Sequence, residues 1–246
     1  MRDIEELKER ARHRDRDALR ELGDHYYREG DMNEASNCYH DLYDMGDYSR
    51  AEQLAKMFLS HNAYGAAFEY GVHIENEERR NYLLGRACFA LKDYQKAYGY
   101  LIECLPKEGK ESEIWLPGLY RLLARMYESG LGCDADMDKA LEYHMKDASL
   151  GYRPETYLEI GRFYHEGRGV PKDDEIALKW WREAIVKMGY PLPEGADILF
   201  AIALIEKDRA DELCELANAL ASGEALSDEM MKEWEKVVGE YSDKTK

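Results

Sequence analysis

The 246-residue sequence is poor in proline, in basic residues and in long apolar runs. It has only 6 prolines, which favours helices because proline interrupts them. The longest apolar run, 198–205, falls far below the ~20 residues that span a bilayer, so we expect no membrane-spanning segment. The 51 acidic residues exceed the 34 basic ones, and the net charge is −17. This charge argues against binding to nucleic acid or to an anionic membrane, both of which favour basic surfaces.

Cysteine patterns are also missing. The five cysteines are odd in number and widely scattered, and no CxxC motif occurs. This excludes the usual zinc motifs and a regular disulfide framework. The first residues, 1–8, are charged and lack the apolar core of a secretion signal. We therefore expect thiols in a reducing compartment, the cytoplasm.

A period of 37 residues is the strongest positive feature. It separates Tyr127 from Tyr164, and it also separates Gly130 from Gly167, Gly132 from Gly169 and Ala140 from Ala177. Self-similarity at one fixed period in this range is typical of helical repeat arrays. Each unit is predicted to consist of a helix, a glycine-containing turn and a second helix.

Three earlier segments repeat the same arrangement with shorter loops. A small residue in the first helix is followed 12 residues later by an alanine in the second, at Gly23 and Ala35, Ala55 and Ala67, and Gly85 and Ala97. In the later pair, Ala124 and Ala140, and Gly161 and Ala177, the spacing is 16 residues. The small residue is expected to let the two helices of a unit approach closely.

These motifs resemble known repeat families. The Leu-Gly, aromatic and alanine pattern of the first three units is similar to the tetratricopeptide repeat. The sequence Gly-Arg-Gly-Val-Pro-Lys-Asp at 167–173, followed by Ala-Leu-Lys-Trp at 177–180, resembles the Sel-one-like repeat. The unit at 119–152 is similar, although it has Cys133-Asp134 in place of Val-Pro. The resemblance implies an all-α fold, a right-handed α-α superhelix (solenoid) of about five to six helix-turn-helix repeats with terminal capping helices. It also implies a protein-interaction scaffold or adaptor that is not an enzyme.

The rhythm of the repeats suggests four segments. Residues 1–105 would hold a capping helix and tetratricopeptide-like repeats, 106–118 a connection, 119–190 two Sel-one-like repeats, and 191–246 C-terminal helices and a cap. The alternative is one continuous solenoid domain, 1–246. Ser227 is a suitable N-cap for the last helix, whose apolar face would contain Met230, Trp234, Val237 and Tyr241.

Motifs for catalysis or metal binding are incomplete. Asp134, Asp136 and Asp138 alternate like the start of a calcium loop, but Lys139 and Met145 stand where glycine and glutamate are needed. Helix capping before Ala140 explains these acids better. No two histidines stand at i, i+4, and none stands beside a cysteine as a catalytic base would. We predict no catalytic residue, no metal and no cofactor.

A cationic stripe is the candidate binding site. In four consecutive units the small residue of the first helix is followed directly by a cation: Lys56, Arg86, Arg125 and Arg162. One step along a helix rotates the side chain by about 100°, so these cations are expected to point away from the packed face. Tyr82, Phe89 and Arg121 are predicted to share this stripe, which lines the concave surface in the repeats that the chain resembles. Because arginine suits carboxylates, the expected partner is a protein or peptide with an acidic segment or a C-terminal carboxylate. Three alternatives stay open: the cations only balance neighbouring glutamates, the acidic surface acts as an inhibitor or immunity-type protein against a basic partner, or the chain regulates an enzyme complex.

Overall fold

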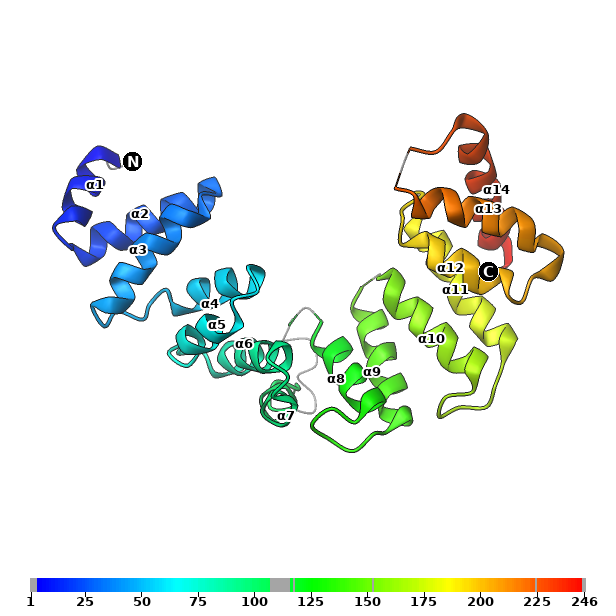
Figure 1. Ribbon diagram of the computed structural model, residues 1–246, viewed down its shortest axis with the longest axis horizontal. Helices are drawn as coiled ribbons and strands as arrows, with labels where there is room; N and C mark the ends of the chain where they lie inside the picture. Colours follow the sequence, from blue (N-terminus) through cyan, green and yellow to red (C-terminus); the bar gives the residue numbers. More distant parts are fainter. Residues whose placement is uncertain (1–3, 107–115, 117, 152, 224, 245–246) are drawn as a thin grey trace. The chain divides into compact units, whose positions relative to one another are not determined.

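The computed structural model describes residues 4–106, 116, 118–151, 153–223 and 225–244, and these residues form an all-helical protein (Figure 1). Within these ranges there is no strand, and one short 3-10 helix spans Lys207–Arg209. The α-helices have the following bounds: α1 Ile4–Arg12, α2 Arg16–Glu29, α3 Met32–Asp44, α4 Ala51–Ser60, α5 Tyr64–Gly71, α6 Glu77–Ala90, α7 Tyr94–Ile102, α8 Leu119–Ser129, α9 Met137–Leu150, α10 Pro154–Glu166, α11 Asp174–Met188, α12 Gly195–Ala203, α13 Ala210–Ala221 and α14 Asp228–Lys244. The predicted fold class, helix-turn-helix repeats preceded and followed by further helices, is confirmed.

The chain divides into two compact units. Unit 1 comprises Met1–Leu119 with Leu131–Cys133, and unit 2 comprises Tyr120–Gly130 with Asp134–Lys246. Most of the predicted connection, 106–118, lies outside the described residues.

The helix pairs of unit 1 form around the small residues that the sequence analysis singled out. The pairs α2/α3, α4/α5 and α6/α7 pack against each other. The first-helix residues Gly23, Ala55 and Gly85 are buried. A Cβ atom on Gly23 would lie 2.6 Å from the ring of Tyr39, and one on Gly85 would lie 2.7 Å from Leu101. The close approach of the two helices therefore requires a residue with little or no side chain at these positions.

The breaks between paired helices also follow the sequence. Gly30 ends α2 with φ 83°, a left-handed conformation that glycine adopts readily. Asp31 then caps α3 by accepting a hydrogen bond from the amide of Glu34. In unit 2 Gly167 ends α10 with φ 71°, and Asp173 caps α11 through the amides of Glu175 and Ile176. Asp136 caps α9 in the same way, as the sequence indicates for the acids before Ala140.

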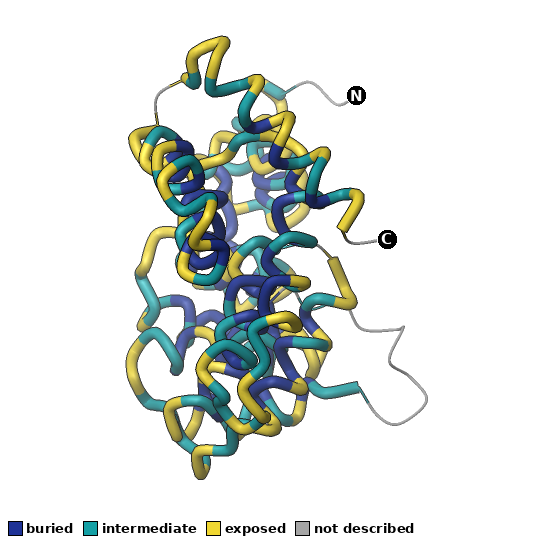
Figure 2. Tube along the Cα trace, turned by 90° about the vertical axis from the view of Figure 1, so that its right-hand side faces the viewer, coloured by how far each residue is buried: buried dark blue, intermediate teal, exposed yellow. Residues whose placement is uncertain are grey.

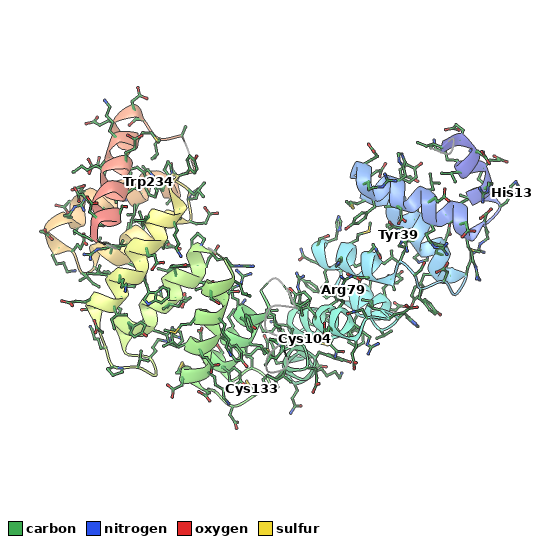
Figure 3. The ribbon with its side chains drawn as sticks, turned by 180° about the vertical axis from the view of Figure 1, so that it is seen from behind. His13, Tyr39, Arg79, Cys104, Cys133 and Trp234 are labelled. Atoms are coloured by element: carbon green, nitrogen blue, oxygen red, sulfur yellow. The ribbon has the colours of Figure 1, made fainter. Side chains whose placement is uncertain are left out.

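The core of unit 2 is built from α10 to α14. Figure 2 shows the buried residues gathered inside the helix packing and the exposed ones at turns and outer faces. Trp181 of α11 is 1% exposed, and its indole nitrogen donates a hydrogen bond to the carbonyl of Leu158, 3.0 Å away. Helix α14 covers α11 with Trp234 (labelled in Figure 3), Val237 and Tyr241, a set of side chains exposed by at most 1%. The predicted apolar face of the last helix is confirmed, and Ser227 caps this helix through the amide of Met230.

Candidate functional site

The residues after the small helix-packing positions turn outward. Lys56, Arg86 and Arg125 are exposed, and Arg162 is partly exposed. In the first repeat the equivalent residue, Asp24, is an acid and is held by neighbouring side chains. It accepts hydrogen bonds from Tyr39 and from Arg50, so it joins the first helix pair to the start of the second.

Unit 1 contains a hollow of about 370 Å³ formed by α4 and α6 together with Leu116. We call it the cationic hollow, and it is lined by Glu52, Lys56, Arg79, Tyr82, Leu83, Arg86 and Leu116. Arg79, Tyr82 and Arg86 are spaced i, i+3 and i+7 on α6, so they share one face of this helix. Arg79 is labelled in Figure 3. Three cations and one carboxylate thus line the described part of this hollow.

The carboxylate of Glu52 holds two of these cations. Its Oε1 lies 2.5 Å from Nζ of Lys56, and its Oε2 lies 3.2 Å from Nη1 of Arg79. Burial by itself raises the pKa of Glu52, but the hydrogen bonds from Lys56 and Arg79 outweigh it and hold this pKa below its usual value. Glu52 therefore stays charged at neutral pH, and it neutralises only one of the two cations beside it.

Arg86 is bound differently from its neighbours. Its guanidinium carbon lies 5.5 Å from the centre of the Tyr82 ring, a cation–π contact, and no carboxylate among the described residues is within ion-pair distance of it. Tyr82 is only 6% exposed, so it forms part of the wall rather than an open edge. Phe89 does not line the cationic hollow; its ring centre lies 5.5 Å from that of Tyr94.

The other predicted cations belong to unit 2 and line two further hollows. Arg121 and Arg125 line one of about 250 Å³ formed by α8, α9 and α10. Arg162 lines another of about 450 Å³, whose walls include Trp181 and Phe200. Arg162 also pairs with Glu159, with Nη1 2.6 Å from Oε1. The cations of the predicted stripe thus line three hollows, and a groove that joins them stays a prediction.

A hydrogen-bonded network of one buried and two partly buried polar side chains lies beside Arg121 and Arg125. His144 is 2% exposed, and its Nε2 lies 2.5 Å from Oε1 of Glu128. Arg168 donates to the other oxygen of Glu128 at 3.0 Å. Burial alone raises the pKa of Glu128, but the hydrogen bonds from His144 and Arg168 hold it below its usual value. Sequence reasoning missed this network, because its members come from two helices, α8 and α9, and from the loop after α10.

The thiols of Cys38 and Cys104 are buried. Burial raises the pKa of Cys38 to about 11 and that of Cys104 to about 12, so these thiols are poor nucleophiles at neutral pH. Within the described ranges, no group of at least three His, Cys, Asp or Glu side chains is arranged to hold a metal ion. Among the described helices, none combines the length and the apolar character that a membrane crossing requires.

These features define a protein built from α-helical hairpin repeats with polar hollows between its helices. The family model described as Sel1 repeat matches residues 60–103, 120–152 and 154–185, so the chain contains Sel1 repeats. The first match includes a segment whose pattern resembles the tetratricopeptide repeat. Sel1 repeat proteins are typically non-catalytic and generally mediate protein–protein interactions.

Solved structures show the same fold. One is a protective antigen of uropathogenic Escherichia coli strains that displays an SLR fold; it is 16% identical, with a TM-score of 0.53, and the match covers 97% of this chain and 48% of that one. The chain thus spans about half the length of that protein. A Sel1 repeat protein from Oxalobacter formigenes is also 16% identical, with a TM-score of 0.50, and 89% and 84% of the two chains are covered. A comparison with curated proteins gives no match.

Proposed function

We propose that the chain is a non-enzymatic scaffold or adaptor that binds an acidic segment of a protein partner at the cationic hollow of unit 1. The observation that carries this proposal is the local excess of positive charge. Lys56, Arg79 and Arg86 line the cationic hollow, and Glu52 is the only carboxylate among the described residues that line it, although the whole chain has a net charge of −17.

The chemistry of the cationic hollow fits a carboxylate next to an apolar group. Arginine presents a planar fork of donors that matches a carboxylate in two parallel hydrogen bonds. Arg86 has this fork available, and Leu83 and Leu116 add apolar surface beside it. The carboxylate is that of an acidic side chain or of the partner's C-terminus. The surrounding negative charge repels acidic segments that do not reach the cations, which favours specificity over general attraction.

The test starts from a peptide selected for binding. Peptides displayed with free C-termini and as internal segments are selected against the wild-type chain, and the affinity of the best one is measured by fluorescence anisotropy. We expect acidic residues to be enriched. The double variant Arg79→Glu/Arg86→Glu should bind the selected peptide about 100-fold more weakly, since each lost charge pair contributes about tenfold. Because both side chains are exposed, its melting temperature should change little.

The matched control is Lys92→Glu, an exposed cation at the turn between α6 and α7 that does not line the cationic hollow. It makes the same kind of charge change on the same helix pair. If it weakens binding as much per charge as the double variant does, the effect is general electrostatics and the proposed site is wrong. Unchanged binding by the double variant contradicts the proposal directly.

A second candidate is the inhibitor-type function, in which an acidic face binds a basic partner. It is favoured by a hollow of about 400 Å³ on α13 and α14 that is lined by Glu212, Glu215, Glu229 and Glu233 beside Leu216 and Met230. Glu215→Lys/Glu229→Lys would then abolish binding of a basic peptide, while Arg79→Glu/Arg86→Glu would not weaken it. The same selection separates the two candidates, because it enriches acidic peptides in one case and basic peptides in the other.

A further inference from the structure

The hollow of about 250 Å³ in unit 2, here called the mixed-charge hollow, has charges of opposite sign on different helices. It is lined by Arg121, Arg125, Glu128, His144, Glu155, Thr156 and Glu159. Arg121 and Arg125 stand one turn apart on α8, and Glu155 and Glu159 stand one turn apart on α10. Like charges at i, i+4 weaken a helix slightly. A pair of cations on α8 and a pair of anions on α10 thus line the same hollow.

One member of each pair, Arg121 and Glu155, has no counterion among the described residues. The Oε1 atom of Glu159 lies 2.6 Å from Nη1 of Arg162, and its Oε2 atom lies 3.7 Å from Nη1 of Arg168. Arg121 and Glu155 differ from it, because neither has an ion-pair partner among the residues that the structure describes. They line the same hollow without pairing with each other. The space between them therefore separates a positive group from a negative one.

The lining also includes a side chain with a buried ring nitrogen that lacks a hydrogen-bond partner among the described residues. His144 is 2% exposed, and its Nδ1 has no hydrogen-bond partner in the described part of the chain, whereas its Nε2 contacts Glu128. The hydroxyl of Thr156 already donates to Asp147, 2.6 Å away. A buried nitrogen without a partner is uncommon in folded proteins, and here it belongs to a side chain that lines the mixed-charge hollow.

We propose that the mixed-charge hollow binds a zwitterion of amino-acid size that has a carboxylate at one end and a cationic side chain at the other, as in lysine or arginine. The carboxylate pairs with Arg121, whose donors match it, and the cation pairs with Glu155. Drug-sized ligands occupy about 300–1,000 Å³, so about 250 Å³ suits a smaller molecule. A purely acidic segment is disfavoured, because three glutamates line the space. None of these residues lines the cationic hollow of unit 1, so this proposal does not depend on the proposed function.

The same chemistry has two sources, a free amino acid or the C-terminal residue of a peptide, and the test includes both. Isothermal titration calorimetry measures binding of L-lysine, L-arginine and a short N-acetylated peptide that ends in lysine. Two analogues each lack one charge: L-lysinamide has no carboxylate, and L-norleucine has no cationic side chain. We expect saturable binding of one ligand per chain, and at least about tenfold weaker binding of each analogue. Binding of the peptide alone assigns the site to a C-terminus, and binding of the free amino acids assigns it to a small molecule.

The variants test the two ends separately. With Arg121→Gln, lysine should lose its advantage over lysinamide, and with Glu155→Gln, it should lose its advantage over norleucine. Lys179→Gln, an exposed residue of α11 outside the mixed-charge hollow, is the control and should bind lysine like the wild type. Glu155 lies in the first turn of α10, where an acid favours the helix, so thermal melts confirm that each variant is folded. Absence of saturable binding by every probe, equal binding of the analogues, or variants that bind like the wild type would each refute the proposal.

Discussion

Replacement of Gly161 by alanine tests whether close contact between paired helices determines the stability of this fold. Gly161 lies on α10 against α11, and a Cβ atom there would overlap the indole nitrogen of Trp181 and lie 2.5 Å from its Cε2. Trp181 is 1% exposed, and its indole nitrogen is fixed by a hydrogen bond to the carbonyl of Leu158. The variant must shift either the indole or the two helices.

The expected loss follows from three contributions. Moving the indole breaks its hydrogen bond to the carbonyl of Leu158, and a buried donor left without a partner costs about 1–3 kcal/mol. Forcing a methyl group into a packed interface costs about 1–3 kcal/mol more. Alanine in place of glycine in a helix returns about 1 kcal/mol. The free energy of unfolding should therefore fall by about 1–5 kcal/mol.

The assay is urea unfolding followed by far-ultraviolet circular dichroism. Gly239→Ala is the matched control, because Gly239 lies inside α14 in the same unit and a Cβ atom there meets nothing within 4 Å. This variant should gain about 0.5–1 kcal/mol from helix propensity alone. If Gly161→Ala is as stable as the wild type, or gains as much as Gly239→Ala, then the close packing at this position does not have the role inferred here.

Two further predictions concern single interactions in each unit. The pKa of Asp24 is lowered by hydrogen bonds, from Arg50 above all and also from Tyr39. Because the pKa of this carboxyl is lower in the folded than in the unfolded chain, the ionised group stabilises the fold at pH values above its ordinary pKa of about 4. This contribution disappears as the pH falls through the pKa of the folded state. The stability advantage of the wild type over Asp24→Asn, measured by urea unfolding across this pH range, should shrink towards acid, and a constant difference would contradict the assignment. Trp234→Ala should lower the stability of unit 2 by about 3–5 kcal/mol, and truncation after residue 227 should lower the melting temperature and the solubility because it uncovers α11. The control is Tyr190→Ala, at a side chain that is 76% exposed. If Trp234→Ala and the truncated chain melt at the same temperature as this control, α14 is not a cap.

The fold could be predicted from the sequence because its signals are local and recur. A small residue, a turn residue and an alanine return at fixed spacings, and each of these determines a contact between helices that are neighbours in the chain. Gly30, Asp31, Asp136 and Asp173 act within a few residues of their own positions, so the ends of helices could be predicted as well. The outward direction of Lys56, Arg86 and Arg125 follows from the same geometry, since a residue next to a buried helix position must turn away from it.

The sites depended on the tertiary structure, because their residues come from separate helices. The sharing of Glu52 between Lys56 and Arg79 brings together α4 and α6, and the sequence contains no pattern that links them. Glu155 and Glu159 line the same hollow as Arg121 and Arg125, and this depends on the packing of α10 against α9. Spacing along one helix determines which side chains share a face, whereas the opposite wall of a hollow is determined by the packing of another helix. The sequence by itself therefore predicted the repeats and their cations, and it allowed pairs within one helix such as Lys56 with Glu52. It did not predict the partners that a second helix brings, such as Arg79 beside Glu52.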